Sequence, residues 1–513
     1  MKSLFVLVFV ITFVLRLLPG NLQNMPFTMD QGRDLVDVRQ IWQGTDIRLI
    51  GPTTSLNGVY LGPFYYYLIS IPHLLSTGDP RSVLVWQIIC FHLAVIFFWK
   101  TFNKQSSSFA NFVSILLLVS PISFYSNRYF WNANFMPTFT ILFLTLLINT
   151  QSSDKRSKND YLLGLVAGIS LQIEAAFGIL FLPFSILFYL ATKATIPRFS
   201  RLLVGFFVTL IPQIAFEFSK YFPMTKVFLN EISGNTSTLG EKLSGLERLS
   251  QRKESFISAF NQSSHISPNY LLYLLIICLL IFIFYRGKSQ QKVAKSTSTI
   301  TLFFLLFSIL FYFVYPAIIK SWYIFSISLI FSLLIGSSLA LLDPNNSIYK
   351  VLTTLVLVAS FIAVFRSQKE YLTSPSYKSP NDPSAFTNQI KIVDDIYRRV
   401  DGGSFYVYNY IPSVYDYPFQ YLFWSHGLKK YGYSPNDLAY LPNQPEYIKS
   451  KNSYLKNLRP VTNNTPTILI IQEGDNKTHL QEWMGNFAYL CKEAKTEYSF
   501  GQKVLYLKPC SVN

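Results

Sequence analysis

Runs of about 17 to 21 apolar residues recur along most of the chain, and they constrain the fold more than any other feature. Each run is long enough to cross a bilayer as a helix. Only 14% of the 513 residues are charged and 50% are hydrophobic, whereas a soluble protein carries roughly 25% charged residues. We therefore predict a mostly helical, polytopic membrane protein.

About eleven transmembrane helices are predicted, the first within "MKSLFVLVFVITFVLRLLPG" (1–20). A cleaved signal peptide is the alternative there, but a small-x-small cleavage site is missing, and Arg16 followed by Pro19 is typical of a helix end. The other predicted spans are 82–101, 108–126, 136–150, 161–175, 176–192, 200–218, 269–285, 298–315, 322–342 and 348–366.

The placement of basic residues predicts the orientation of the spans. With Lys2 in the cytoplasm, four further basic loops fall on the same side, as the positive-inside rule requires. The N-terminus is then cytoplasmic in the plasma membrane, and the C-terminal tail is extracytoplasmic. The basic loops are those with Lys100 and Lys104, with Lys155, Arg156 and Lys158, with Lys193, Arg198 and Arg201, and with Arg286, Lys288, Lys292 and Lys295.

The formal charge of +17 does not indicate a nucleic-acid partner. From Ser367 onward the chain has sixteen Lys and Arg against thirteen Asp and Glu, which is close to neutral. Much of the surplus lies in short loops between apolar runs, and no aromatic-basic nucleic-acid motif is present.

The division of apolar and polar sequence predicts two domains. Residues 1–366 form a transmembrane domain with outer loops at 20–80 and 219–268, and residues 367–513 form a small extracytoplasmic α/β domain. In that domain we expect a helix at 383–400 and strands at 404–410, 467–472 and 504–509.

Four cysteines are present, without a CxxC motif or a Cys/His cluster that would predict a thiolate metal site. Cys90 and Cys278 lie in apolar runs as small packing residues. Outside the cell, Cys491 and Cys510 can form a disulfide. Two free thiols are the alternative.

The segment "VYLGPFYYYLISIPHLL" (59–75) is apolar but contains a Gly-Pro pair, a tyrosine cluster and Pro72. We interpret it as a helix at the membrane interface, with Gly62, Pro63, Tyr65 and Tyr66 at its start. A crossing helix here would move every later loop to the other side and violate the charge rule.

Charge is concentrated directly after the first span, in "DQGRDLVDVR" (30–39). On a helix that begins near Asp30, the side chains of Asp30, Arg33, Asp34 and Asp37 share one face. Arg33 can then pair with Asp30 or Asp37. A solvated loop is the plainer interpretation of such a cluster.

These motifs resemble the GT-C glycosyltransferases, in particular the bacterial branch related to protein O-mannosyltransferases and the aminoarabinose transferase of lipid A. That branch commonly reads "DxGRD…GP…GPxYYYL", and this chain has "DQGRD" (30–34), "IGP" (50–52) and "LGPFYYYL" (61–68). The loop "SNRYFWNANFMP" (126–137) and "GLVAGISLQIEAAFG" (164–178) are also similar. The resemblance implies transfer of a sugar from a polyprenyl-phosphate donor to a glycan, lipid or protein acceptor at the outer membrane face, with inversion.

Such a transfer requires a general base for the acceptor and positive charge for the leaving phosphate. The resemblance favours Asp30 as the base, with Asp34 as second choice; a helix N-cap and an exposed partner of an arginine are the respective plainer roles. Arg33, Arg128 and Lys320 are predicted to bind the donor phosphate. For Arg128 and Lys320, anchoring at the membrane interface is the alternative.

Glu174 is the second acidic candidate, because an acid at the end of an apolar run is costly unless it has a function. It is predicted to bind acceptor, sugar or a metal, and relatives often have histidine at this position. Asp30 and Glu174 have oxygen ligands suited to a divalent ion, but the sequence does not require a cofactor. The chain also departs from the family in "IIKSWYIF" (318–325), which has Lys320 but lacks an arginine.

The long serine-rich segment 219–268 is predicted to be a lid or binding loop rather than a connector.

Two other functions remain open from the sequence. A transporter or flippase of lipid-linked glycans would show paired halves and mid-membrane charge, and a glycan polymerase or ligase would use a different donor. A membrane-anchored binding protein would not need so many spans.

Overall fold

The computed structural model describes residues 2–44, 47–151, 156–232, 245–264, 279–285, 289, 291–315, 318–373, 381–411, 417–442, 454–474 and 476–510. These residues divide into two compact units. Unit 1 comprises residues 1–18, 47–69 and 84–373, and unit 2 comprises residues 19–46, 70–83 and 374–513. Two parts of the predicted outer loop 20–80 therefore group with the C-terminal region.

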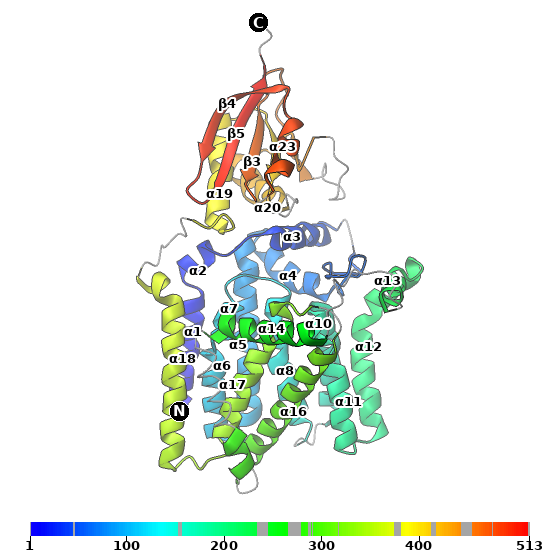
Figure 1. The fold of residues 1–513 in the computed structure, drawn as a ribbon, viewed down its shortest axis with the longest axis vertical. Helices are drawn as coiled ribbons and strands as arrows, with labels where there is room; N and C mark the ends of the chain where they lie inside the picture. The colour runs from blue at the N-terminus through cyan, green and yellow to red at the C-terminus, as the bar shows by residue number, and fades with distance from the viewer. Residues whose placement is uncertain are drawn as a thin grey trace. The chain divides into compact units, whose positions relative to one another are not determined.

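Unit 1 is a bundle of helices (Figure 1). Its long members are α1 (Lys2–Arg16), α5 (Pro80–Asn103), α6 (Ser107–Leu118), α8 (Met136–Asn149), α9 (Arg156–Ile173), α11 (Phe181–Ala191), α12 (Ile196–Ser219), α16 (Lys292–Val314), α17 (Phe325–Leu339) and α18 (Ser347–Thr373). Shorter or connecting elements are α7 (Pro121–Tyr125), η1 (Ala133–Phe135), α10 (Ala175–Gly178), α13 (Pro223–Ile232), α14 (Gly245–Ser264) and η2 (Ser321–Ile324). Helix α4 (Phe64–Leu75) begins in unit 1 and ends in unit 2, and the first residues of α5 also belong to unit 2.

The helices follow the predicted spans closely. Within the described residues, five helical segments are long and apolar enough to cross a membrane: 80–103, 196–219, 292–314, 321–339 and 347–369. Shorter apolar helical segments cover 107–118, 133–149 and 175–191. The predicted span 269–285 lies mostly outside the described residues, and 279–285 are helical. The prediction of a mostly helical, polytopic membrane protein is confirmed.

Helices α9 and α12 pack backbone against backbone, and glycines make this possible. A Cβ on Gly164 would lie 2.1 Å from the Leu202 carbonyl oxygen, and a Cβ on Gly205 would lie 2.3 Å from that of Tyr161. Gly164 and Gly168 form a GxxxG motif, which typically lets helices approach closely within a membrane. The glycines of "GLVAGIS" therefore serve the packing of these two helices.

The segment 219–268, predicted as a loop, contains two helices, α13 and α14. Figure 1 shows α14 running across the bundle. The fully buried guanidinium of Arg252 on α14 donates from Nε to the Tyr312 carbonyl at 3.0 Å and from Nη2 to the Tyr315 carbonyl at 2.6 Å. It thereby satisfies backbone carbonyls at the end of α16, where a cation is electrostatically favoured.

Unit 2 contains a five-stranded sheet of order β2-β1-β3-β5-β4 (Figure 1). β1 pairs in parallel with β2 and β3, whereas β5 is antiparallel to β3 and β4. The strands are β1 (Tyr406–Tyr410), β2 (Asp437–Ala439), β3 (Thr467–Gln472), β4 (Leu490–Glu497) and β5 (Gln502–Pro509). The helical elements are α2 (Pro19–Gln23), α3 (Met29–Trp42), α19 (Phe386–Val400), α20 (Tyr417–Leu422), η3 (Phe423–Leu428), α21 (Lys429–Tyr431) and α23 (Lys477–Gly485). The predicted α/β domain is confirmed.

Alternating side chains of the strands build the core of the sheet. Leu469, Ile471, Leu505 and Leu507 pack with Trp483 of α23 on one face. Successive strand residues point to opposite faces, so Tyr506 belongs to the other face.

Unit 2 also joins distant parts of the sequence through backbone hydrogen bonds. The Phe27 N–H donates to the Ser384 carbonyl at 2.8 Å, and the Phe386 N–H donates to the Met25 carbonyl at 3.0 Å. The segment that follows the first predicted span is therefore tied to the start of α19.

Candidate functional site

The charged cluster after the first predicted span lies at the start of helix α3. The helix begins at Met29, because Thr28 and Gln31 form a capping box in which the Thr28 N–H donates to Gln31 Oε1 at 2.9 Å. This start confirms the predicted helix and places Asp30 in its first turn, where a negative charge is favoured by the helix dipole.

Arg33 holds two carboxylates on this helix. Its Nη1 lies 3.0 Å from Asp30 Oδ1, and its Nη2 lies 2.8 Å from Asp34 Oδ1. The side chain of Asp30 is 34% exposed, whereas that of Asp34 is 0% exposed. The predicted pairing of Arg33 with Asp30 is thus present, but the alternative role of Asp34 as an exposed arginine partner is wrong, because the packing of α3 buries it completely.

Burial sets the electrostatics of Asp34. Loss of water raises the pKa of the Asp34 carboxyl to about 7, although the adjacent Arg33 guanidinium acts to lower it. A carboxyl with such a pKa exchanges its proton near neutral pH, which is a property of many catalytic acids and bases.

The glycine of the "DQGRD" motif has a packing role. A Cβ on Gly32 would lie 2.6 Å from both the Pro418 nitrogen and the Tyr417 carbonyl carbon, at the start of α20. Only glycine permits this approach of α3 to α20, and the approach helps to bury Asp34. The motif thus combines charged side chains with the residue that lets the helix pack.

In unit 1, the "IGP" and "LGP" motifs pair with each other. The Gly51 N–H donates to the Leu61 carbonyl and the Leu61 N–H donates to the Pro52 carbonyl, both at 2.8 Å. Gly62 lies against the Gln172 side chain, whose Oε1 accepts from the Phe64 N–H at 3.3 Å. Pro63 directly precedes α4, and this pairing sets where the helix begins.

Tyr65 and Tyr66 point into the protein. They are 0% and 1% exposed, and the Tyr65 ring packs edge-on against Phe135 at a centroid distance of 6.0 Å. Their burial makes them packing residues of the helix start. The position of α4 relative to a membrane interface stays a prediction.

Glu174 caps a short helix in unit 1 and lies close to the loop 126–137. Its Oε1 accepts from the Ala176 N–H at 3.3 Å, and its Oε2 accepts from Asn132 Nδ2 at 3.3 Å. The Asn132 amide also donates to the Ile173 carbonyl at 2.8 Å, which fixes its orientation. Glu174 is 8% exposed and interacts electrostatically with Lys320.

Lys320 stands among aromatic and hydroxyl groups. Its Nζ lies 5.1 Å from the Trp322 ring centroid and 3.4 Å from Ser55 Oγ, which is hydrogen-bonded to the Tyr323 hydroxyl at 2.6 Å. The Trp322 ring in turn packs edge-on against Trp131 at 5.4 Å. Unit 1 therefore brings the predicted residues Glu174 and Lys320 together beside an aromatic cluster.

Arg128 is half-buried, and its Nη2 donates to the Ser367 carbonyl at 3.4 Å. It lies near enough to Tyr125 to influence that phenol electrostatically. Among the residues that the structure describes, this one long hydrogen bond uses only one of the five N–H groups of the guanidinium, so the others can donate to a ligand.

Sequence reasoning missed three polar residues around this part of unit 1. Asn132 orients Glu174, Arg252 holds the end of α16, and the buried Tyr312 hydroxyl lies within hydrogen-bond distance of two carbonyl oxygens, that of Ala176 at 2.9 Å and that of Tyr323 at 3.0 Å. The helix that carries Arg252 could have been predicted, because apolar residues at 246, 249, 256 and 260 have helical spacing. Asn132 and Tyr312 have no comparable sequence signal.

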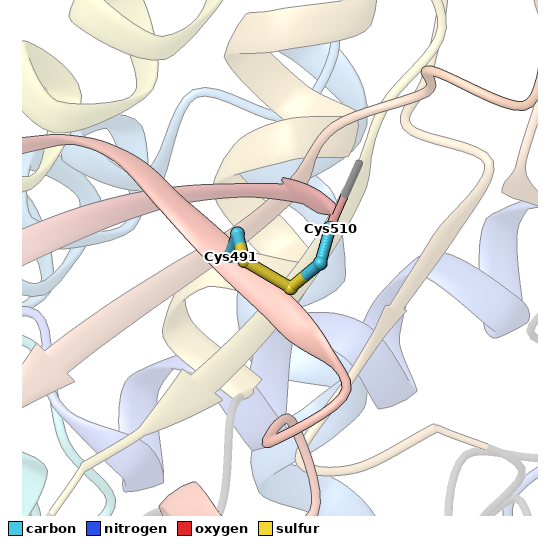
Figure 2. Close-up of a disulfide and its surroundings, with 2 residues drawn as sticks. All are labelled: Cys491 and Cys510. Atoms are coloured by element: carbon cyan, nitrogen blue, oxygen red, sulfur yellow. A yellow bond between two sulfur atoms is a disulfide. The ribbon is translucent and has the colours of Figure 1, made fainter. Parts of the chain in front are cut away.

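Among the residues that the structure describes, no group of three or more His, Cys, Asp or Glu side chains could hold a metal ion. Cys491 and Cys510 form a disulfide, as Figure 2 shows. It joins the start of β4 to the residue after β5. Of the two alternatives that the sequence leaves open, a disulfide or two free thiols, the structure contains the disulfide.

This architecture, a bundle of apolar helices with a small C-terminal sheet domain, is that of a polytopic membrane protein. Its structure is similar to that of ArnT from Cupriavidus metallidurans bound to undecaprenyl phosphate, with a TM-score of 0.57, 12% identity, and coverage of 99% of this chain and 98% of the other. The apo structure of the same protein gives a TM-score of 0.55 at 12% identity, with 98% and 97% coverage. No family model and no curated protein sequence matches the chain.

Proposed function

We propose that the protein is a membrane glycosyltransferase that moves a sugar from a polyprenyl-phosphate carrier to an acceptor, with Asp30 as the general base. One observation carries the proposal. In a chain with the GT-C fold, the "DQGRD" motif presents one accessible carboxylate, Asp30, aligned by Arg33 on a capped helix. The undecaprenyl phosphate bound to the similar ArnT supports the class of carrier.

The proposed reaction is a single displacement at the anomeric carbon of the donor sugar. The acceptor oxygen or nitrogen bonds to this carbon as the bond to the phosphate oxygen breaks, and the acceptor proton passes to Asp30. Polyprenyl phosphate leaves with the electron pair. One base and no covalent intermediate are required, so the configuration inverts.

Asp30 is preferred over Asp34 because a base must reach the acceptor. The Asp34 side chain is fully buried, and its contact with Arg33 suits a role in orienting the guanidinium. Arg33 then holds the Asp30 carboxylate in place, since the rigid fork of donors on a guanidinium fixes the geometry of its ion pairs.

Because cations stabilise a leaving phosphate, Arg33 in unit 2 and, separately, Arg128 and Lys320 in unit 1 are each proposed as a phosphate-binding residue. Lys320 supplies a point charge, and the two arginines can bind phosphate through two parallel hydrogen bonds. Glu174 is proposed to bind the acceptor, the sugar or a divalent ion. Its amide partner Asn132 and the Trp131–Trp322 pair suit a polyhydroxylated ligand.

The C-terminal domain is proposed to be extracytoplasmic, with the N-terminus in the cytoplasm. The Cys491–Cys510 disulfide supports this orientation, because disulfides persist in oxidising compartments. A membrane-impermeant maleimide on intact cells tests it. We expect cysteine introduced at the exposed position Leu458 to react, and cysteine at the exposed position Lys350 to react only after the membrane is permeabilised.

The decisive experiment uses the full-length protein in nanodiscs with a panel of radiolabelled polyprenyl-phosphate sugars and a membrane extract as acceptor. Release of polyprenyl phosphate together with transfer of label is expected for the wild type and not for Asp30→Asn. If no donor in the panel is turned over while the lipid-linked sugar is moved across vesicle membranes, the flippase alternative replaces the transferase. Turnover only of donors with long glycans would instead favour a polymerase or ligase.

A further inference from the structure

A polar groove lies in unit 2, and the residues that line it belong to other elements than α3. It has a volume of about 500 Å³, within the range of about 300–1,000 Å³ typical of ligand sites. The end of α19, the segment 460–466 and the strand pair β4–β5 enclose it. Most of its lining side chains are polar or charged. Such a lining would be unusual in a binding site for an apolar ligand. The residues used below are Arg399, Ser404, Thr465, Glu493, Tyr506 and Lys508.

The floor of the groove is a chain of hydroxyl groups. Ser404 Oγ and Thr465 Oγ1 are hydrogen-bonded at 2.9 Å, and both residues are buried. Thr465 Oγ1 also accepts from the Thr462 N–H at 2.8 Å. Hydroxyl groups both donate and accept, so this floor matches a ligand that is itself rich in hydroxyls.

Arg399 lines the groove, and its guanidinium lies over an aromatic ring. The Arg399 Cζ atom lies 4.5 Å from the centroid of the buried Tyr506 ring. A guanidinium that lies over an aromatic ring is attracted by the ring face and still has N–H groups that can donate to a ligand. Among the described residues, Arg399 makes no hydrogen bond or ion pair, so its fork of donors is available to an anion.

The strand pair β4–β5, which the disulfide joins, lines the groove with a paired cation and anion. Lys508 Nζ lies 2.8 Å from Glu493 Oε1. Glu493 occupies a β-bulge, because the register passes from Lys492 opposite Leu507 to Ala494 opposite Tyr506. Bulges redirect a side chain and recur beside binding sites. Cys491, opposite Lys508 in the register, carries the disulfide shown in Figure 2.

From these features we propose that the groove binds a saccharide chain that bears an acidic group. The hydroxyl floor and Glu493 bind sugar hydroxyls, while Arg399 and Lys508 bind a carboxylate or phosphate on the chain. With two cations and one carboxylate, these charged residues favour an anionic ligand. This inference rests on the proposed glycosyltransferase function, for which the groove is a holding site for acceptor or product glycan.

The test measures binding of trigalacturonate to the full-length protein in nanodiscs by isothermal titration calorimetry, with maltotriose as the neutral control. We expect wild type to bind trigalacturonate at least ten-fold more tightly than maltotriose, and Arg399→Gln to lose at least ten-fold in affinity. Arg399→Lys should retain part of it. Arg398→Gln is the matched control, because Arg398 is the adjacent exposed arginine and pairs with Asp395 instead.

Several results would overturn the inference: no binding of trigalacturonate, equal affinity in Arg399→Gln, or an equal loss in Arg398→Gln. Binding of inorganic phosphate or of a triaspartate peptide as tight as that of trigalacturonate would show an anion site without sugar recognition, and would also overturn it. A glucose 6-phosphate arm shows whether a sugar phosphate can replace the uronate.

Failure of this inference is separable from failure of the proposed function. Asp30→Asn should bind trigalacturonate as the wild type does, since Asp30 does not line the groove. Sugar transfer without trigalacturonate binding would reject the groove alone. Binding without transfer from any donor would reject the transferase and leave the groove as a saccharide site.

Discussion

Two fully buried aspartates, Asp34 in α3 and Asp160 in α9, show how the same residue type serves different purposes in the two units. Both carboxyl oxygens of Asp160 are bound, Oδ1 by Arg198 Nη2 at 2.9 Å and Oδ2 by Arg201 Nη2 at 3.1 Å, and the Tyr189 hydroxyl also donates to Oδ1. This cluster joins α9, α11 and α12.

Arg33, which pairs with Asp34, also pairs with a second carboxylate. This second partner is Asp30, whose side chain is one-third exposed. Asp160 in unit 1 thus joins helices through its ion pairs. Asp34 in unit 2 instead binds Arg33, and Arg33 also binds the accessible carboxylate of Asp30. The burial of an acidic residue therefore indicates its role only when the other partners of the paired arginine are known as well.

The largest effect is expected for Asp30→Asn. Loss of a general base typically slows a reaction by about 10²–10⁴-fold, and the substitution leaves the buried pair of Arg33 and Asp34 in place. We expect sugar transfer in nanodiscs to fall by that factor at an unchanged melting temperature. Asp37→Asn, on the same helix, is the matched control and should stay within about three-fold of wild type. Equal losses in both variants would end the assignment.

Asp160→Asn should act on stability instead. Removal of one partner from a buried ion pair costs up to about 3–5 kcal/mol, because the half-buried Arg198 and Arg201 would lose the fully buried carboxylate that binds them. We expect a much lower melting temperature, but an unchanged transfer rate per folded molecule. Asp343→Asn, at an exposed turn, is the control. A stable Asp160→Asn protein without activity would reverse the roles assigned to the two aspartates.

Gly32→Ala should have an intermediate effect. The added methyl group meets the backbone at Pro418, which cannot move as a flexible side chain would, so overpacking of about 1–3 kcal/mol is expected. Thermal unfolding of the variant measures it, with Gly485→Ala, where a Cβ meets nothing within 4 Å, as the control. Equal stability of both variants would show that α3 does not need its close approach to α20.

The smallest effect, for each pH unit, is the pH dependence of stability that Asp34 confers. Burial raises its pKa in the folded state to about 7, above the value of roughly 3.9 expected in the unfolded chain. The folded state therefore binds more protons between these two values, and stability falls as pH rises through this window, by roughly 1 kcal/mol per pH unit. Melting temperatures from pH 4 to 8 should decline less in Asp34→Asn than in wild type. Parallel curves would contradict the burial argument.

Much of the fold could be predicted from the sequence, because hydrophobic length and strand alternation are local signals. The spans, the strands at 404–410 and 467–472 and a helix that begins near Asp30 follow from such signals. The N-cap role considered for Asp30 is wrong, because Thr28 is the N-cap. The burial of Asp34 could not be predicted, since it depends on α20 approaching Gly32 from nearly 400 residues away in sequence. Arg198 and Arg201, the partners of Asp160, were likewise predicted only as basic residues of a loop.

The candidate site was predicted in part. The pairing of Arg33 with Asp30 follows from helical spacing, and the proximity of Glu174 and Lys320 is compatible with their predicted roles. The contribution of Asn132 and the groove at Arg399 arises from tertiary contacts between segments that have no distinctive local pattern. Helix α14 was missed because its polar composition masked an apolar helical spacing.

The most direct test of the central claim compares sugar transfer by Asp30→Asn and Asp34→Asn with that of the wild type, in nanodiscs, between pH 6 and 9. We predict that Asp30→Asn loses at least about 100-fold at every pH. Asp34→Asn should keep transfer within about ten-fold, because its buried carboxyl does not touch the acceptor. If Asp34→Asn abolishes transfer, Asp30→Asn retains it, and the wild-type rate rises with pH around 7, then the buried carboxyl of Asp34 is the base and Asp30 is not.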